Sequence, residues 1–192
     1  MSGDGAALLA RIQREAAALP QLWVFAYASL IWRPEFEVAE QHRAHVLGWH
    51  RALRMWSHIN RGSFEQPGLV FALLPGGSCQ GLVCRVPDDD RAQVLERLWA
   101  REMPMAVYTP RWLRCRTPQG TVPALAFTLA RSHPSHTGEL SAHQLQHIFR
   151  HAQGRFGSTL DYARQTHQAL RAHGIEDHAL ARMLRHAPQP AQ

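Results

Sequence analysis

The sequence contains no lysine, because all 21 of its basic side chains are arginine. Every mechanism that needs a lysine amine is therefore excluded, including Schiff-base chemistry, the anchoring of pyridoxal phosphate and the lysine of phosphate-binding loops. The net charge is +6, but the arginines are spread along the chain rather than gathered in one block. Charge alone therefore does not indicate a nucleic-acid partner.

Cysteine and long apolar runs are also scarce. Cys79, Cys84 and Cys115 are odd in number and no two are spaced as C-x-x-C, so the sequence supports neither a disulfide framework nor a zinc ribbon. We expect a reducing compartment, the cytoplasm. No apolar run has the length of a membrane-spanning helix, and two arginines and a glutamate interrupt residues 6–19, so neither a membrane partner nor a signal peptide is expected.

A chain of 192 residues has the length of a single domain, and we expect one domain over residues 1–192. Short strand-like runs, separated closely by glycine and proline turns, predict an α+β fold with a small mixed β-barrel and flanking helices. The expected strands cover residues 22–27, 44–49, 51–56, 69–74, 81–86, 112–116 and 122–129. The expected helices cover residues 1–20, 87–102, 141–152, 159–172 and 177–186, and residues 187–192 form a loose tail.

One helix places a carboxylate on its apolar side. Its buried stripe is predicted to consist of Val94, Leu95, Leu98 and Trp99. The same spacing continues to Glu102, which should therefore face inward at the end of the helix. Burial beside a tryptophan and a helix C-terminus both raise the pKa of a carboxyl, so Glu102 could exchange protons near neutral pH. The alternative is a Glu102 side chain that faces solvent or pairs with Arg101.

Three other patterns have simpler explanations than a functional site. His143, His147 and His151 recur at helical spacing opposite an apolar face, so we expect them to face water and expect no metal site. Arginines, histidines and tryptophans alternate over residues 42–61 as in a half-exposed strand, so no nucleic-acid partner is expected. Ser29 lacks the G-x-S-x-G setting of a nucleophile, but a turn after a strand exposes backbone N–H groups that can hold a carboxylate or an oxyanion.

The segments 24–32 (VFAYASLIW) and 99–102 (WARE), with Tyr108, resemble the ChaC-type γ-glutamylcyclotransferases. Smaller matches to the family occur in the family's order along the chain, at residues 48–51, 61–62, 67–68 and 154–162. The resemblance therefore covers nearly the whole chain and implies a small β-barrel with flanking helices. It also implies that a γ-glutamyl compound, by default glutathione, is cyclised to 5-oxoproline with release of an amine, without a cofactor or metal.

The resemblance assigns roles to individual residues. Glu102 would be the catalytic acid and base. The substrate-binding residues would be Val24, Phe25, Ala26, Tyr27, Ala28, Ser29, Leu30, Tyr108 and Tyr162. Backbone N–H groups of the loop 27–30 would hold the α-carboxylate of the substrate and polarise its γ-carbonyl.

The chain departs from the family motif at two glycines, which are replaced by Ala26 and Ala28. Alanine at a position that needs a positive φ would cost about 1–2 kcal/mol, and its methyl group could crowd the substrate. The alternative function is therefore a non-catalytic protein of the same fold that binds γ-glutamyl ligands. In either case the expected partner is a small molecule, and the sequence makes no prediction of oligomeric state.

Overall fold

The computed structural model describes residues 3–103, 107–185 and 187. Contacts divide the chain into two compact units, the first made of Met1–His50 and Leu73–Ala130, the second of Arg51–Ala72 and Arg131–Gln192. Two long strands, β2 (Glu40–Ser57) and β3 (Gly68–Arg85), contribute residues to both units.

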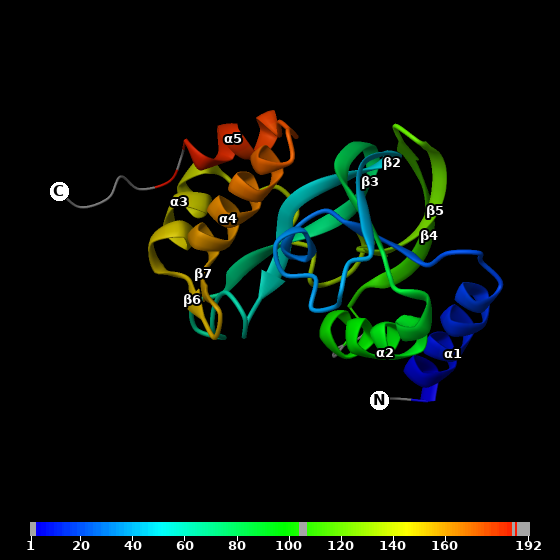
Figure 1. Ribbon diagram of the computed structural model, residues 1–192. Coiled ribbons are helices and arrows are strands. Elements are labelled where there is room, and N and C mark those ends of the chain that lie inside the picture. Colours follow the sequence, from blue (N-terminus) through cyan, green and yellow to red (C-terminus); the bar gives the residue numbers. More distant parts are fainter. Residues whose placement is uncertain (1–2, 104–106, 186, 188–192) are drawn as a thin grey trace. The chain divides into compact units, whose positions relative to one another are not determined.

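A closed barrel is formed by β2, β3 and three shorter strands, β1 (Trp23–Ala26), β4 (Thr109–Thr117) and β5 (Gly120–Thr128), in the order β1-β3-β2-β4-β5 (Figure 1). β1 pairs with a neighbour along both edges: Val24 lies opposite Cys84 of the antiparallel β3 and opposite Leu125 of the parallel β5. Both parallel and antiparallel pairs are present, so the prediction of a mixed barrel in an α+β fold is confirmed.

Two predicted strand ends are wrong. Gly48 and the segment 75–77 were expected to be turns, but β2 and β3 run through them as continuous strands. Gly48 and Gly77 have φ values of 80° and 69°, which glycine adopts without steric cost. The chain therefore changes direction locally at these glycines without ending the strand.

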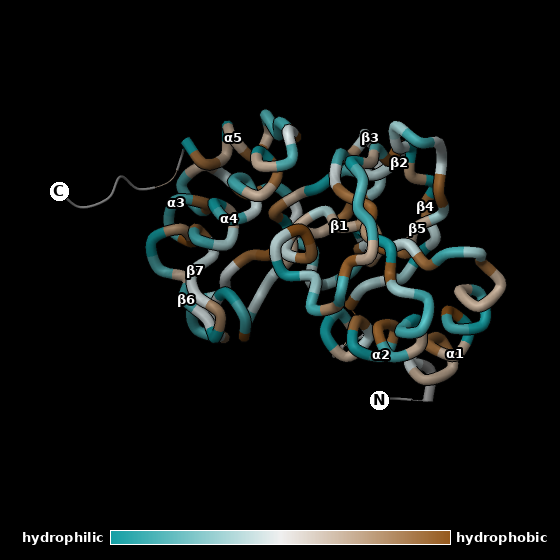
Figure 2. The backbone as a smooth tube through the Cα atoms, viewed as in Figure 1, coloured by the Kyte–Doolittle hydropathy of each residue, from teal (hydrophilic) through white to brown (hydrophobic). Residues whose placement is uncertain are grey.

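Two helices belong to the first unit. Helix α1 (Gly3–Ala17) ends before Pro20, and Trp112 of β4 donates a hydrogen bond of 2.8 Å from Nε1 to Oε2 of Glu15 on this helix. Helix α2 (Arg91–Glu102) follows a short 3-10 turn, η2 (Asp88–Asp90). Both helices alternate hydrophobic and hydrophilic positions (Figure 2), which is the pattern of helices that bury one face.

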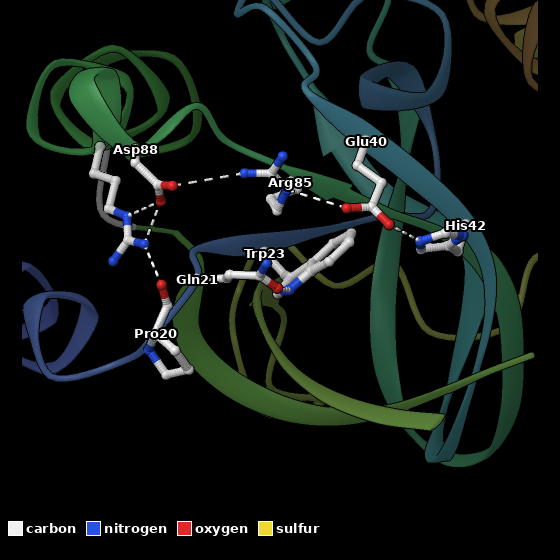
Figure 3. Close-up of polar contacts among 8 residues, drawn as sticks. Pro20, Gln21, Trp23, Glu40, His42, Arg85 and Asp88 are labelled. Carbon is white, nitrogen blue, oxygen red and sulfur yellow. Dashed lines mark hydrogen bonds and ion pairs between the residues drawn. The ribbon is translucent and has the colours of Figure 1, made fainter. Parts of the chain in front are cut away.

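A chain of ion pairs joins the start of β2, the end of β3 and the start of α2 (Figure 3). Arg85 Nε lies 3.2 Å from Glu40 Oε2, and Arg85 Nη1 lies 3.8 Å from Asp88 Oδ2. Arg91 pairs with the same aspartate and donates to the carbonyls of Leu19 and Pro20. These contacts fix the entry of α2 and the connection into β1.

The second unit contains three helices and a short hairpin: α3 (Ala142–His151), β6 (Gln153–Gly154), β7 (Gly157–Ser158), α4 (Thr159–Ala172) and α5 (His178–Leu184). Ser141 forms a capping box with Gln144 at the start of α3. Ser158 caps α4 in the same way, by accepting a hydrogen bond from the backbone N–H of Asp161. The predicted helices of this unit are therefore confirmed, with small differences at their ends.

A buried ion pair fastens α5 to β2 within this unit. Arg51 lies 2.6 Å from Asp177, and their side chains are only 4% and 15% exposed. Asp177 also accepts from the backbone N–H of Leu180, so it caps α5. Burial raises the pKa of Asp177, but the attraction of Arg51 and the hydrogen bonds that the carboxylate accepts outweigh burial, so its pKa is lowered.

We predict that Asp177→Asn lowers the free energy of unfolding by about 3 kcal/mol at pH 7, because Arg51 then stays buried without a counter-charge. Asparagine still caps a helix, so the substitution removes mainly the charge. A lowered carboxyl pKa contributes stability above its unfolded value of about 4, and this contribution is lost as the pH falls through the folded value. The difference between wild type and variant, measured by urea unfolding, should therefore shrink in acid.

The neighbouring Glu176→Gln is the matched control, because Glu176 is strongly exposed and lies 3.8 Å from His178. We expect it to change the free energy of unfolding by less than about 0.5 kcal/mol. Equal effects of the two substitutions at pH 7 would contradict a stabilising role for the Arg51–Asp177 pair.

Candidate active site

The loop after β1 lies at the end of a fully buried strand. Val24, Phe25 and Ala26 are at most 1% exposed, and their backbones pair with β3. Their side chains therefore belong to the barrel core. Gly81 of β3 has Ala26 as its close neighbour, because a Cβ atom at Gly81 would lie 2.4 Å from the Ala26 carbonyl oxygen.

Hydrogen bonds hold the loop itself in one conformation. Tyr27 donates from its hydroxyl to the carbonyl of Phe127 on β5 at 2.9 Å. The 3-10 turn η1 (Ser29–Ile31) follows, in which Ile31 N–H donates to the Ala28 carbonyl at 2.9 Å. Arg33 N–H donates to the Ser29 carbonyl at 2.8 Å, so the chain stays tightly turned as it leaves the barrel.

The two alanines of the loop do not occupy positive-φ positions. Ala28 has a φ of −145°, and Glu35 is the non-glycine residue with positive φ within the described part of the chain. Ala26 and Ala28 are both buried, at 1% and 6% exposure. The replacement of glycine by alanine therefore places no residue in the left-handed region, which removes the backbone argument for a non-catalytic protein.

Glu102 is the last residue of α2, and its side chain faces inward as predicted, with 16% exposure. The helix buries Val94, Leu95, Leu98 and Trp99, the four positions expected from the sequence. Glu102 also pairs with its neighbour, because Arg101 Nε lies 2.9 Å from Glu102 Oε1. The inward position and the Arg101 pair, weighed as alternatives, therefore occur together.

The pKa of Glu102 is raised above its ordinary value. Burial is the largest cause, and the nearby negative charge of Glu35 adds to it. The positive charge and hydrogen bond of Arg101 act in the opposite direction without cancelling the effect of burial. A carboxyl in this setting binds a proton more readily than one in water, which suits it to act as a base and then as an acid.

Arg101 connects Glu102 to the loop after β1. Its Nη2 donates to Ser29 Oγ at 2.9 Å, and its Nη1 donates to the Arg33 carbonyl at 2.6 Å. Sequence reasoning treated Arg101 as part of a motif and missed this role. The contacts join residues more than sixty positions apart, so no local pattern in the sequence could have predicted them.

A small, shallow depression lies beside these residues. Its lining consists of Pro34, Glu35, Phe36, Arg97, Leu98 and Arg101. Arg101 therefore borders both the depression and the Glu102 carboxyl, and Glu35 lines the depression in contact with Arg101. Two arginines and one glutamate make this surface net positive.

The two tyrosines expected at the site lie in different units. Tyr108 is half-buried in the first unit, and the centre of its ring lies 6.5 Å from the centre of the Phe127 ring in an edge-on arrangement. The carbonyl of Phe127 is also the acceptor for the Tyr27 hydroxyl. The structure thus brings Tyr27 and Tyr108 to the same residue of β5. Tyr162 lies on α4 in the second unit, where its ring packs 5.4 Å from Phe71.

Further residues singled out in the sequence gather around Tyr162. The guanidinium carbon of Arg61 lies 4.8 Å from the centre of the Tyr162 ring. Gly62 and Gly68 are in close backbone contact, because a Cβ atom at Gly62 would lie 2.0 Å from the Gly68 N atom. The Thr159 hydroxyl accepts from the Leu69 N–H at 2.8 Å. The segments 61–62, 67–68 and 154–162 therefore form one cluster within the second unit.

The histidines of α3 and the tests for a metal site and a membrane span form a separate group of observations. His143, His147 and His151 are exposed on α3, as predicted. Among the described residues, no group of three or more histidine, cysteine or acidic side chains is placed to hold a metal ion. The described helices include none that is both long and apolar enough to span a bilayer.

The chain is similar in sequence to two proteins named as glutathione-specific γ-glutamylcyclotransferases. The chain is 33% identical over 164 residues to the glutathione-specific γ-glutamylcyclotransferase of Escherichia coli, which covers 85% of this chain and 71% of that protein. It is 27% identical to the human glutathione-specific γ-glutamylcyclotransferase 1, covering 73% of this chain and 66% of the relative, just under two thirds of its length.

The fold has counterparts among solved structures. A yeast γ-glutamyl cyclotransferase specific to glutathione superposes with a TM-score of 0.77 at 20% identity, covering 86% of this chain and 95% of that chain. A second structure, a γ-glutamyl cyclotransferase, has a TM-score of 0.53 at 13% identity and covers 85% and 86% of the two chains. At these identities the likeness shows the fold alone. The family model of ChaC-like proteins matches residues 22–189, and this chain belongs to that family.

Proposed function

We propose that this chain is a γ-glutamylcyclotransferase that cleaves glutathione or a related γ-glutamyl peptide. The products are 5-oxoproline and the released amine, which is Cys-Gly when the substrate is glutathione. The observation that carries the proposal is the buried Glu102 carboxyl, whose pKa is raised and which Arg101 connects to the loop after β1. The activities for which the relatives are named support the same reaction.

The reaction is an intramolecular aminolysis, so it consumes no water. The α-amine of the substrate loses a proton and attacks its own γ-carbonyl carbon, which forms the ring C–N bond. The γ-amide C–N bond then breaks, and the leaving nitrogen gains a proton. Of the three protons on the starting ammonium group, one stays on the lactam nitrogen and two leave with the released amine as its ammonium form.

Glu102 performs the proton transfer in this proposal. As a carboxylate it accepts a proton from the ammonium group, and as a carboxylic acid it returns that proton to the leaving nitrogen. Backbone N–H groups of the loop 27–30 bind the α-carboxylate and stabilise the developing oxyanion, while Val24, Phe25 and Ala26 hold the loop in place from the core. Tyr108, which lies in the same unit as Glu102, supplies a polar wall of the substrate site, and a substrate role for Tyr162 stays a prediction from the sequence.

We also propose that the protein works in the cytoplasm. Cys84 and Cys115 are buried thiols, and the thiol is the usual state of cysteine in a compartment kept reduced by glutathione. Such a compartment also supplies the proposed substrate.

The first prediction concerns the reaction. Incubation of the purified protein with glutathione should produce equimolar 5-oxoproline and Cys-Gly, quantified by chromatography. A panel of γ-glutamyl amino acids, tested in parallel, reports whether the released amine must be a dipeptide. The absence of 5-oxoproline with every member of the panel would refute the proposed activity.

The second prediction concerns Glu102. Glu102→Gln keeps the size of the side chain and an oxygen that can accept from Arg101, but it removes the exchangeable proton. We expect kcat for 5-oxoproline formation to fall by at least about 100-fold, the usual effect of losing a general base. Glu96→Gln on the exposed side of α2 is the matched control and should leave kcat unchanged.

Circular dichroism and urea unfolding should show that Glu102→Gln folds as well as the wild type, because a neutral amide suits this buried position. A variant that keeps most of its turnover would show that another group transfers the proton.

The third prediction concerns the loop. Because Ala28 has a negative φ and a buried methyl group, Ala28→Gly should leave kcat/KM within about threefold of wild type, while the added chain flexibility lowers the free energy of unfolding by about 0.5–1 kcal/mol. Steady-state kinetics and urea unfolding measure the two effects. A large rise in turnover would instead show that the methyl group crowds the substrate.

A further inference from the structure

The guanidinium of Arg101 is shared between two carboxylates. Its Nε contacts Glu102 Oε1 at 2.9 Å, and its Nη1 lies 3.3 Å from Glu35 Oε2. The remaining donors bind Ser29 Oγ and the Arg33 carbonyl. One positive charge therefore faces two carboxylates, and each carboxylate weakens the electrostatic attraction between Arg101 and the other carboxylate.

The backbone of Glu35 is in an unfavourable conformation. Its φ is 60°, in the left-handed region that residues with side chains rarely adopt. Glycine would adopt this conformation more readily, so the backbone alone does not favour a glutamate here. The side chain forms two ion pairs, to Arg101 and to Arg33 Nε at 2.7 Å, which offset this cost and fix the carboxylate beside Arg101.

The charged groups that act on the Glu102 carboxyl, within the described residues, come from two elements. Arg101 belongs to α2 itself, and Glu35 belongs to the segment after η1. Arg33, on the same segment, is paired with Glu35 and so reduces the charge that Glu35 presents. Glu35 is 41% exposed, so solvent screens its influence, and we expect its effect on Glu102 to be moderate.

We propose that Glu35 is a positioning residue: by sharing the Arg101 guanidinium with Glu102, it sets how readily Glu102 takes up a proton. The kinetic consequence rests on the proposed function, in which Glu102 is the acid and base. Without Glu35, the positive charge of Arg101 would stabilise the Glu102 carboxylate more strongly, and Glu102 would then be a weaker base.

The kinetic test compares Glu35→Gln with the control Glu37→Gln, which removes an exposed carboxylate two residues away. In Glu35→Gln the acidic limb of the pH profile of kcat/KM should move to lower pH. The plateau kcat should fall by about three- to tenfold, because a weaker base accepts the substrate proton less readily. Glu37→Gln should match the wild type in both respects. An unmoved acidic limb in Glu35→Gln would overturn the proposal.

A variant with glycine separates charge from loop shape. Glu35→Gly suits the left-handed backbone better than glutamate does, yet it removes the carboxylate. If Glu35 acts through its charge, Glu35→Gly should show the same shifted profile as Glu35→Gln. A wild-type profile for Glu35→Gly would mean that only the shape of the loop matters, which overturns the proposal.

Direct titration keeps this test separate from that of the proposed function. The Glu102 carboxyl can be followed by NMR in protein labelled with ¹³C at glutamate side chains, and its signal is assigned by its loss in Glu102→Gln. The proposal requires a lower titration midpoint in Glu35→Gln and an unchanged one in Glu37→Gln, whether or not the protein turns over glutathione. Equal midpoints would refute the proposal, whereas a shifted midpoint together with full turnover in Glu102→Gln would refute only the catalytic role of Glu102.

Discussion

The four residues of β1 are the constraint on which the proposed site depends. β1 lies between parts of β3 and β5, because it pairs with β3 along its antiparallel edge and with β5 along its parallel edge, while β3 and β5 also pair directly at Leu73 and Thr128. The side chains on both faces of β1 are buried, so its pairing register is fixed, because a shift of one residue would move every side chain to the opposite face. The loop that follows therefore leaves the barrel from a fixed point, and Tyr27 is held to β5 immediately after the strand.

The proposed acid and base chemistry depends on a balance between burial and charge at the end of α2. Burial alone would favour a neutral Glu102, which could not accept a proton, whereas full pairing with Arg101 would favour a carboxylate too weak to hold one. The structure lies between these extremes, because burial outweighs Arg101 and Glu35 opposes Arg101 further. The same few side chains thus fix the position of Glu102 and its affinity for protons.

Local patterns in the sequence predicted the helices well. The four buried positions of α2 follow from spacing over a few residues, and they are confirmed. Strand ends were harder, because Gly48 and Gly77 have the backbone of a turn but lie within continuous strands. Neighbouring strands supply the hydrogen bonds that keep such a strand intact, and a single sequence does not show them.

The candidate site, too, could be predicted from the sequence only in part. The inward position of Glu102 was predicted from helical periodicity, whereas its environment was not, because Ser29, Glu35 and Arg101 meet only after the barrel and α2 have formed. The conformation of Ala28 also required the structure, since its negative φ depends on how the chain leaves β1.

The buried cysteines have a consequence for a protein proposed to work among thiols. Burial raises the pKa of both Cys84 and Cys115 to about 12. At neutral pH only about one in 10⁵ of such groups is a thiolate, the form that attacks a disulfide. These two cysteines are thus inert to exchange with disulfides of small thiols, so the barrel that contains them should keep its packing as the ratio of reduced to oxidised thiols around it changes.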